Sequence, residues 1–393
     1  MSTFGGKIKE IPGISVDRFD EENLDSDAYF LSHCHADHMV GLNNAKFQET
    51  LRKRGCYIYV SHVSKAILQQ LHPEIRDRIR ELDFHTTTPI YLENVCISVI
   101  PIPSGHCPGS VMFLFEGNKT VLYTGDFRMK IDDIRKIRAF YDSTGEIKGI
   151  HSLYLDTTFF FRDYNQFPSR EESLCQIITL IEEWIALGEK HIIHLSTKAR
   201  YGYEFVFCEI FKKIRIPVHI NKREFDFYSL VPSLDGAVTL DASNTKIHCN
   251  CGDTFQSICK NEKMYNLRTI KLSAMRWTTE NLKEDKIINN SETYFVCYST
   301  HASYTEVVDL IKFLKPLWIH PCVLRFNRND EEIYSTINDL LETKNEPIAK
   351  KPKLFDLKKV NNFKEESSEE KNEKYDSLFD EALDSPPETH GNE

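Results

Sequence analysis

The chain has 393 residues, of which 41% are hydrophobic and 27% charged, and its formal net charge is −10 at pH 7. This balance predicts a globular protein, and no window reaches the roughly 18–20 consecutive apolar residues of a membrane-spanning helix. Residues 1–10 show no apolar core of a secretion signal, and the odd number of eleven cysteines favours a reducing, intracellular setting over a disulfide framework.

The negative charge is concentrated near the end of the chain. From Lys364 to Glu393 there are eleven acidic and three basic residues, a net charge of −8, so the rest carries −10 − (−8) = −2. Carboxylates that hold metal ions would make the effective field of that body more positive than this count. The net charge therefore neither supports nor excludes a phosphate-bearing substrate.

The first part of the chain reads as strands separated by polar loops. We expect strands at Tyr29–Ser32, Tyr57–Val60, Cys96–Ile102, Val111–Phe115, Thr120–Tyr123 and Ser152–Leu155. A helical pattern at Val63–Leu71 follows the second of these strands. Glu116–Lys119 has the composition of a short hairpin turn.

After Asp156 the pattern changes to strands that alternate with helices. Ser169 and Glu172 form a capping box, which predicts an amphipathic helix to about Leu187. Further expected strands and helices are His191–Leu195, Tyr203–Lys213, Pro217–Ile220, Tyr294–Tyr298 and Val307–Leu314. This alternation predicts a second domain with its own partly parallel sheet.

From Lys344 the chain loses its apolar periodicity. A basic cluster at Lys350–Lys359 precedes the acidic run, which we expect to be disordered. The basic cluster is interpreted as a nuclear localisation signal, with a solvated linker as the alternative. The acidic segment Tyr375–Leu383 gathers the main apolar residues of this tail.

The strongest chemical signal is a run of three histidines and an aspartate directly after a strand: His33, His35, Asp37 and His38. Residues two apart in extended backbone project to the same side, so His33 and His35 can share one metal ion. Asp37 and His38 can reach a neighbouring position as the chain turns. Imidazole and carboxylate ligands suit zinc or a similar divalent ion, whereas a chance polar loop is the alternative.

Two later loops offer further ligands at strand ends. His106 lies in the tight loop Ser104–Ser110, and Asp126 follows Gly125 at the end of the predicted hairpin. Each would be a weak signal alone. Loops held together by a rigid sheet are where active sites gather, so both are candidate ligands.

This combination of motifs resembles the metallo-β-lactamase superfamily. The resemblance implies an α/β fold, a four-layer αββα sandwich with a two-metal site at one edge. One ion would take His33, His35 and His106, the other would take Asp37 and His38, and Asp126 would bridge them. Asp17 matches the superfamily's first motif, which buttresses the histidine loop; a surface aspartate is the alternative.

Two more motifs resemble the β-CASP branch, and within it the DNA cross-link repair nucleases. Asp156, in Tyr154–Phe159, would orient water or a ligand, and His301, in Thr300–Tyr304, would complete the shell of the second metal. The usual Ser-Ser after that histidine is Ala302-Ser303 here. The expected domains are residues 1–155 and 301–343 for the metallo-β-lactamase part, 156–300 for a β-CASP insertion and 344–393 for the tail.

A second metal site is implied by the same resemblance, within the insertion. A structural zinc would take His219 and His248 with Cys251 and Cys259, and Cys249 could replace Cys251 because the family's first cysteine position is occupied by Asn250. Two histidines and two cysteines are a normal closed zinc set. Buried free thiols are the alternative.

The resemblance implies a metal-dependent DNA endonuclease that opens hairpins and trims overhangs by attack of metal-activated hydroxide on phosphodiesters during non-homologous end joining. Zn²⁺ is the expected cofactor, with Mg²⁺ or Mn²⁺ possible at the second position. Rival readings are a 5′→3′ exonuclease, an RNA-processing nuclease, a small-molecule hydrolase and an inactive nucleic-acid-binding scaffold. The full ligand set argues against the scaffold.

Substrate contacts are expected from backbone and hydroxyl donors and from a basic, aromatic segment: Ser104, Gly105, Ser110, Lys198, Tyr201 and Tyr203. A solvated loop leading into a helix is the alternative for the last three. Expected DNA substrates are hairpins, overhangs and single-strand/double-strand junctions. By resemblance, a nuclear monomer would meet the DNA-dependent protein kinase and the end-joining ligase complex, with no membrane contact.

Overall fold

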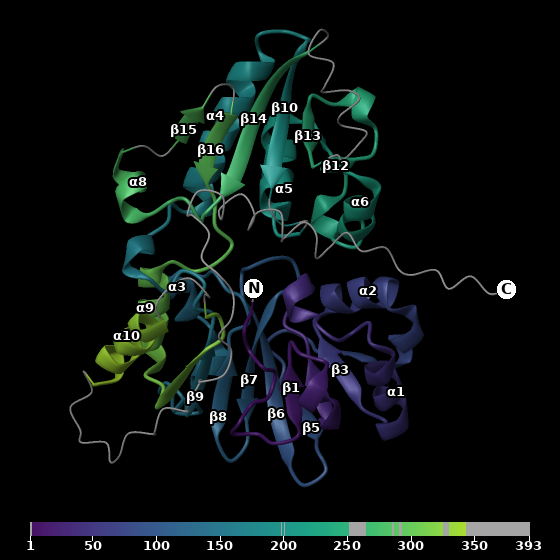
Figure 1. The fold of residues 1–393 in the computed structure, drawn as a ribbon, viewed down its shortest axis with the longest axis vertical. Coiled ribbons are helices and arrows are strands. Elements are labelled where there is room, and N and C mark those ends of the chain that lie inside the picture. Colours follow the sequence, from purple (N-terminus) through teal and green to yellow (C-terminus); the bar gives the residue numbers. More distant parts are fainter. Residues whose placement is uncertain are drawn as a thin grey trace, which may run out of the picture. The chain divides into compact units, whose positions relative to one another are not determined.

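The protein is described by a computed structural model that covers residues 2–197, 199, 201–250, 265–284, 287–290, 293–324 and 330–342. The chain divides into two compact units, Met1–Thr343 and Lys344–Glu393, and the second unit, with the basic cluster Lys350–Lys359, lies outside the described residues. Within the described residues the strands of the first unit form three sheets (Figure 1).

The first sheet is parallel and has the order β1-β2-β3-β4. Its strands are β1 (Ile14–Val16), β2 (Ala28–Phe30), β3 (Tyr57–Val60) and β4 (Ile79–Glu81). One face is covered by α1 (Ala45–Arg54) and α2 (His62–Leu71), whose apolar residues share a buried cluster with the strands. Ser61 begins α2 by accepting a hydrogen bond from the Ser64 amide.

The second sheet has the order β17-β9-β8-β7-β6-β5, parallel at β17-β9-β8 and antiparallel elsewhere. Its strands are β5 (Thr88–Tyr91), β6 (Cys96–Pro103), β7 (Val111–Glu116), β8 (Thr120–Tyr123), β9 (Ser152–Leu155) and β17 (Trp318–Pro321). One face packs against α3 (Ile131–Ile134), α9 (Tyr304–Leu314) and α10 (Asp330–Glu342) in a shared apolar cluster.

These two sheets pack face to face. Phe30 of β2 meets Phe113 and Phe115 of β7 with ring centroids 5.4 and 5.0 Å apart. The apolar residues of both sheets form one buried cluster, and helices cover the two outer faces. The four-layer αββα arrangement predicted from the metallo-β-lactamase resemblance is therefore confirmed.

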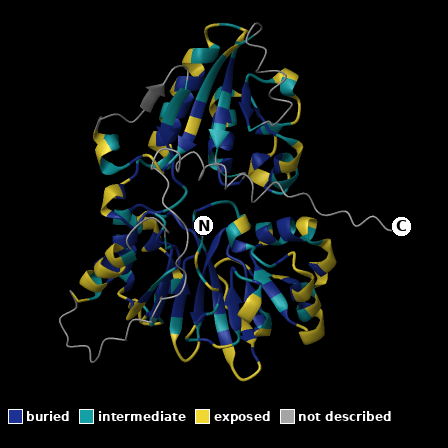
Figure 2. Ribbon diagram, in the orientation of Figure 1, coloured by how far each residue is buried: buried dark blue, intermediate teal, exposed yellow. Residues whose placement is uncertain are grey.

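The third sheet has the order β12-β11-β13-β10-β14-β16-β15 and is parallel except at β15-β16. Its strands are β10 (His191–Thr197), β11 (Val218–His219), β12 (Val238–Thr239), β13 (Ile247–Cys249), β14 (Asn266–Ser273), β15 (Ile287–Asn290) and β16 (Thr293–Cys297). Its helices are α4 (Arg170–Ile185), α5 (Glu204–Ile214), α6 (Lys222–Tyr228) and α8 (Thr279–Glu284). Figure 2 shows its buried core, and the predicted inserted α/β region is confirmed as part of the fold.

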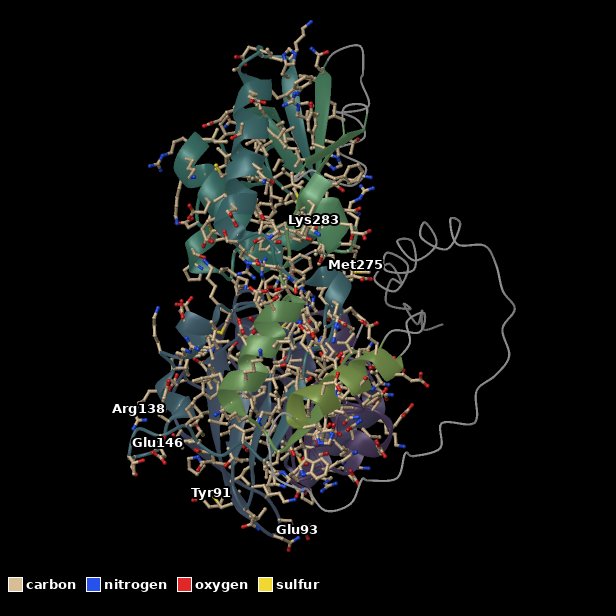
Figure 3. All side chains as sticks on the ribbon, turned by 90° about the vertical axis from the view of Figure 1, so that its left-hand side faces the viewer. Tyr91, Glu93, Arg138, Glu146, Met275 and Lys283 are labelled. Carbon is tan, nitrogen blue, oxygen red and sulfur yellow. The ribbon has the colours of Figure 1, made fainter. Side chains whose placement is uncertain are left out.

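The ends of the strands divide the second sheet into two sides. The turn between β5 and β6 begins after Tyr91 and contains Glu93, and both residues are exposed (Figure 3). It lies at the end of β6 opposite to Pro103, after which the chain runs to His106. The predicted ligands thus follow strand ends on the side away from this turn. No described helix is long and apolar enough to cross a bilayer.

Candidate active site

The predicted ligands come from loops at the carboxyl ends of separate strands. His33 to His38 follow β2 and include a single 3₁₀ turn at Ala36–His38. The other four positions each follow a further strand: His106, Asp126, Asp156 and His301. Although these residues are spread over most of the chain, the structure brings them together.

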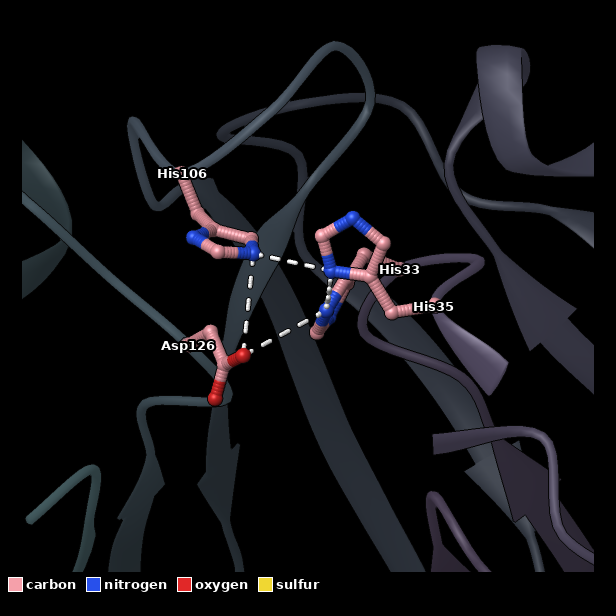
Figure 4. Close-up of side chains that lie close together, drawn as sticks. All are labelled: His33, His35, His106 and Asp126. Carbon is pink, nitrogen blue, oxygen red and sulfur yellow. Dashed lines mark hydrogen bonds and ion pairs between the residues drawn. The ribbon is translucent and has the colours of Figure 1, made fainter. Parts of the chain in front are cut away.

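The first cluster joins three imidazoles and one carboxylate (Figure 4). His35 Nδ1 lies 2.9 Å from His33 Nε2 and 3.0 Å from His106 Nε2. Asp126 Oδ2 lies 3.6 Å from the Nε2 atoms of both His33 and His106. A tetrahedral zinc with nitrogen ligands at about 2.1 Å would hold neighbouring ligand atoms about 3.4 Å apart. The donor set fits one such ion.

The far nitrogen of each ring is engaged by an oxygen that accepts its proton. His35 Nε2 donates to the Tyr201 carbonyl at 2.8 Å, and His106 Nδ1 donates to the Thr300 carbonyl at 2.9 Å. His33 Nδ1 donates to Ser32 Oγ at 2.9 Å, since that hydroxyl itself donates to Asp17. In the neutral form the other nitrogen of each ring then carries a lone pair. Three lone pairs that face one another need a cation between them.

The protonation of these rings agrees with this arrangement. Burial lowers the pKa of His33 and His106 well below the ordinary value, and the neighbouring histidines lower it further. Burial also lowers the pKa of His35. The three rings are therefore neutral near pH 7, which is the form that binds a metal.

A second set of ligand atoms lies beside the first. His38 Nε2 is buried without a well-formed hydrogen bond to any described residue, and it lies 3.4 Å from Asp126 Oδ1 and 3.8 Å from Asp37 Oδ2. Burial lowers the pKa of His38, but the carboxylates of Asp126, Asp37 and Asp17 outweigh it and raise that pKa well above the ordinary value. Asp126 thus faces both sets with its two oxygens. A second cation here would replace the proton that these carboxylates otherwise stabilise on His38 Nε2.

Asp17 braces the histidine loop. Its Oδ2 accepts from Ser32 Oγ at 2.6 Å, His38 Nδ1 at 2.7 Å and Tyr123 Oη at 2.9 Å, and its Oδ1 accepts from the Ser32 amide at 2.7 Å. Asp17 has φ of 55°, a left-handed conformation that is costly for a residue with a side chain. With four donors on its carboxylate, Asp17 orients ligands rather than binding the ion itself.

Asp156 and His301 form a pair at the edge of the cluster. His301 Nδ1 donates to Asp156 Oδ2 at 2.9 Å, and its Nε2 lies 3.8 Å from Asp126 Oδ2. The other oxygen of Asp156 accepts from the amide and hydroxyl of Thr158 at 2.9 and 2.6 Å. Burial lowers the pKa of His301, but Asp126 and Asp156 raise it above its ordinary value. The pair therefore fixes which nitrogen of His301 faces the centre.

Four of the side chains predicted to contact the substrate make contacts within the protein. Ser104 and Ser110 are buried, and their hydroxyls bond to each other at 2.8 Å and to nearby backbone. Tyr201 donates to the Pro108 carbonyl and Tyr203 stacks on Tyr298, both within the core of the third sheet. These four side chains brace the site, and their contact with DNA stays a prediction.

The remaining two substrate predictions are not decided by these contacts. The Gly105 carbonyl accepts a hydrogen bond from Arg170 at 2.5 Å, so this part of the glycine is also used internally. Lys198 lies outside the described residues. Both stay predictions as substrate contacts.

Comparison with known proteins identifies the family. Residues 235–327 match the family described as DNA repair metallo-beta-lactamase. The chain is 36% identical to Protein artemis of Homo sapiens over an alignment of 413 positions, which covers 98% of this chain and 58% of that protein. The chain belongs to the Artemis-like family of DNA repair metallo-β-lactamases.

Other relatives place this Artemis-like chain among longer proteins. Protein artemis of Danio rerio is 35% identical over 98% of this chain and 63% of its own length. DNA cross-link repair 1A protein of Homo sapiens is 28% identical over 80% of this chain and 30% of its own length. The chain thus spans less than two thirds of these relatives.

The predicted structural zinc site of this Artemis-like chain is partly visible. His219 of β11 and His248 of β13 are aligned in neighbouring strands, and their Nδ1 atoms lie 3.2 Å apart. Burial lowers the pKa of His219, and it lowers that of His248 to about 4. Cys251 and Cys259 lie outside the described residues, so the site remains a prediction.

Strand geometry bears on the alternative ligand of that site. Cys249 follows His248 directly in β13, and successive side chains of a strand point to opposite faces. Its sulfur lies 3.7 Å from Thr197 Oγ1 within the core of the third sheet. This geometry disfavours Cys249 as a partner of His248.

Three residues near the site were missed by the sequence reasoning. Arg170 donates to the Gly105 and His106 carbonyls at 2.5 and 3.4 Å. Arg128 donates to the Ser299 carbonyl at 2.8 Å, and Glu204 accepts from the Gly202 amide at 2.9 Å. Arg170 lies inside the predicted capping box and Arg128 two residues after Asp126, but nothing local in the sequence shows which carbonyls they reach.

Proposed function

We propose that this chain is a metal-dependent DNA endonuclease that opens hairpins and trims overhangs in non-homologous end joining. The observation that supports it most is that one nitrogen of each of three largely buried imidazoles faces the carboxylate of Asp126. Such a set is costly without a cation. Membership of a DNA repair family supports DNA as the substrate, and the hairpin specificity follows from the resemblance to Artemis.

The residues that would hold the ions divide into two sets. His33, His35 and His106 would bind one ion, for which three imidazoles favour zinc. Asp37 and His38 would bind the other, with Asp126 between the two. The second set contains more oxygen, so Mg²⁺ or Mn²⁺ could replace zinc there. Bound divalent ions would acidify a water molecule and stabilise charge on phosphate oxygens.

The chain's own side chains have separate roles in this proposal. Asp17 and Ser32 fix the loop that presents His33 and His38. Asp156 holds the Nδ1 proton of His301, so that Nε2 faces the centre. There His301 can complete the second ion's ligands or pass a proton to the leaving oxygen of the phosphodiester.

Partners and location follow the family resemblance and are also proposals. We propose that the protein acts in the nucleus as a monomer with the DNA-dependent protein kinase and the end-joining ligase complex. These contacts are supported by the resemblance to human Protein artemis, of which the chain spans 58%. The basic cluster at Lys350–Lys359, interpreted as a nuclear signal, lies outside the described residues.

The test is cleavage of a covalently closed, internally labelled DNA hairpin, with and without chelator, by the wild type and by Asp37→Ala. We expect metal-dependent opening near the tip that the substitution abolishes. Asp142→Ala is the matched control, because Asp142 is a half-buried aspartate whose carboxylate accepts a hydrogen bond from the Thr144 amide in a surface turn and belongs to neither ligand set.

Other outcomes of this test assign the protein differently. Digestion of a free 5′-phosphorylated end without hairpin opening would support the rival 5′→3′ exonuclease. Binding of both substrates without cleavage would support the inactive scaffold. Opening that survives in Asp37→Ala would contradict the proposed site.

A further inference from the structure

Two of the three histidines of the first cluster are oriented by backbone carbonyls that lie in segments following strands β10 and β16 of the third sheet. His35 and Tyr201 are 166 residues apart in the chain, and His106 and Thr300 are 194 apart, yet each pair is hydrogen-bonded. A peptide carbonyl can only accept a proton, so each bond commits one ring nitrogen as the donor. The orientation of these ligands therefore depends on where the carbonyls of the third sheet's region lie.

The Tyr201 carbonyl is held by a short turn after β10. Gly202 has φ of +118°, a conformation open to glycine and unfavourable for other residues. Its amide donates to Glu204 Oε1 at 2.9 Å. This bond fixes the peptide unit between Tyr201 and Gly202, because the amide and the Tyr201 carbonyl belong to the same plane.

The position of Glu204 suits this role. Glu204 is 3% exposed and is the first residue of α5, where the helix dipole favours a negative charge. Tyr203, the residue before the helix, makes no side-chain cap bond, so the Glu204 carboxylate is the acceptor that serves this turn. The positive charge of Arg170, which bonds the Gly105 and His106 carbonyls, also acts on this carboxyl.

We propose that Glu204 is a positioning residue of the metal centre. By holding the Gly202 amide it fixes the Tyr201 carbonyl, which in turn fixes the ring and the tautomer of His35. The inference rests on the proposed metal-dependent function and adds a residue that touches neither metal nor DNA. Loss of the acceptor frees the peptide unit to rotate, and His35 then loses the bond that presents Nδ1 to the ion.

The test is zinc affinity of the full chain without DNA, measured by competition with a chromogenic chelator. Zinc at the cluster is identified as the zinc that His33→Ala loses. Glu204→Ala should weaken this zinc by about 10–100-fold, the usual effect of removing a group that orients a metal-binding histidine. Glu204→Gln keeps an oxygen acceptor for the Gly202 amide and should stay within about threefold of the wild type.

A second variant tests the same link through the backbone. Gly202→Ala places a Cβ no closer than 3.8 Å to Thr300 and 3.9 Å to Cys107, so it fits the space but not the φ angle. It should also weaken the zinc and shift the visible spectrum of the cobalt-substituted protein. Gly188→Ala is the control, since Gly188 has φ of +140°, its nearest neighbour atom is 3.8 Å away, and it precedes the other end of β10.

The outcomes separate this inference from the proposed function. If the wild-type protein binds no zinc that His33→Ala loses, both the proposed metal-dependent function and the role of Glu204 are refuted. Zinc that depends on His33 but is bound equally by wild type, Glu204→Ala and Gly202→Ala would refute only the role of Glu204. Should Glu204→Ala fail to fold by circular dichroism, the Gly202→Ala affinity and spectrum decide the question.

Discussion

Substituting Asp17 by asparagine keeps the shape of the side chain but changes which atoms donate. Oδ2 accepts hydrogen bonds from the side chains of Ser32, His38 and Tyr123, and Oδ1 accepts one from the Ser32 amide. An NH₂ group at Oδ1 would face a backbone donor that cannot turn away. An NH₂ group in the place of Oδ2 is tolerated if His38 Nδ1 accepts a hydrogen bond from it. The imidazole proton of His38 then lies on Nε2.

The cost of this change can be worked from the structure. The carboxylate receives four charge-assisted bonds, and each lost bond of this kind costs about 1.5–3 kcal/mol. A proton at His38 Nε2 would point toward Asp126 Oδ1, now 3.4 Å away, and remove the lone pair meant for the metal. We expect the affinity of the second site to fall by about 10–100-fold, equivalent to about 1.4–2.7 kcal/mol.

The assay combines metal competition with ¹H–¹⁵N NMR of the imidazole rings. In the presence of metal we expect Asp17→Asn to bind it more weakly and to keep a proton at His38 Nε2, whereas in the wild type the metal replaces that proton. Asp27→Asn is the control, because Asp27 accepts from Arg54 at 2.8 Å but lies outside both ligand sets. Unchanged affinity with His38 still protonated at Nδ1 would refute this account of Asp17.

Three further predictions concern stability and thiol chemistry. Burial raises the pKa of Glu204 from 4.5 to about 7, so the contribution of this residue to stability is full below pH 4.5 and is lost as the pH rises through about 7. The unfolding free energy of Glu204→Gln should therefore exceed that of the wild type by about 3 kcal/mol at pH 8 and match it near pH 4.5 in denaturant titrations. An equal difference at both pH values would contradict this. Gly109→Ala, whose Cβ would lie 2.7 Å from Val63, should lower unfolding stability by on the order of 2 kcal/mol, and an unchanged thermal midpoint would argue against the tight packing of that loop. Burial raises the pKa of the Cys34 thiol to about 12, so a thiol reagent should modify the exposed Cys96 and spare Cys34. Cys34→Ala should also keep the wild-type rate of DNA cleavage. Rapid labelling of Cys34 in the native protein would oppose this.

Local sequence patterns predicted most of the elements near the site. Tyr57–Val60 and Ser152–Leu155 are strands with the expected bounds, and the capping box at Ser169 begins α4. These elements have strong local signals, namely β-branched or aromatic residues in strands and a reciprocal cap at a helix start. The metal motif was also visible because its first four ligands are neighbours in the chain.

The sequence could not show what lies around the ligands. Tyr201 and Tyr203 have the composition of a nucleic-acid-binding segment, but both rings are buried in the core of the third sheet. Alternation in a short loop does not tell which way such a ring points. The carbonyls that orient His35 and His106 come from residues more than 160 positions away, and a carbonyl leaves no trace in residue type.

The central claim is that metal held by the buried cluster is required for cutting DNA. The most direct measurement titrates zinc-free protein with zinc or manganese and follows bound metal and single-turnover opening of a closed DNA hairpin in the same samples. The account predicts that opening rises in proportion to metal bound at the cluster, and that Asp126→Asn loses both. Hairpin opening by metal-free protein, or by Asp126→Asn at the wild-type rate, would contradict it.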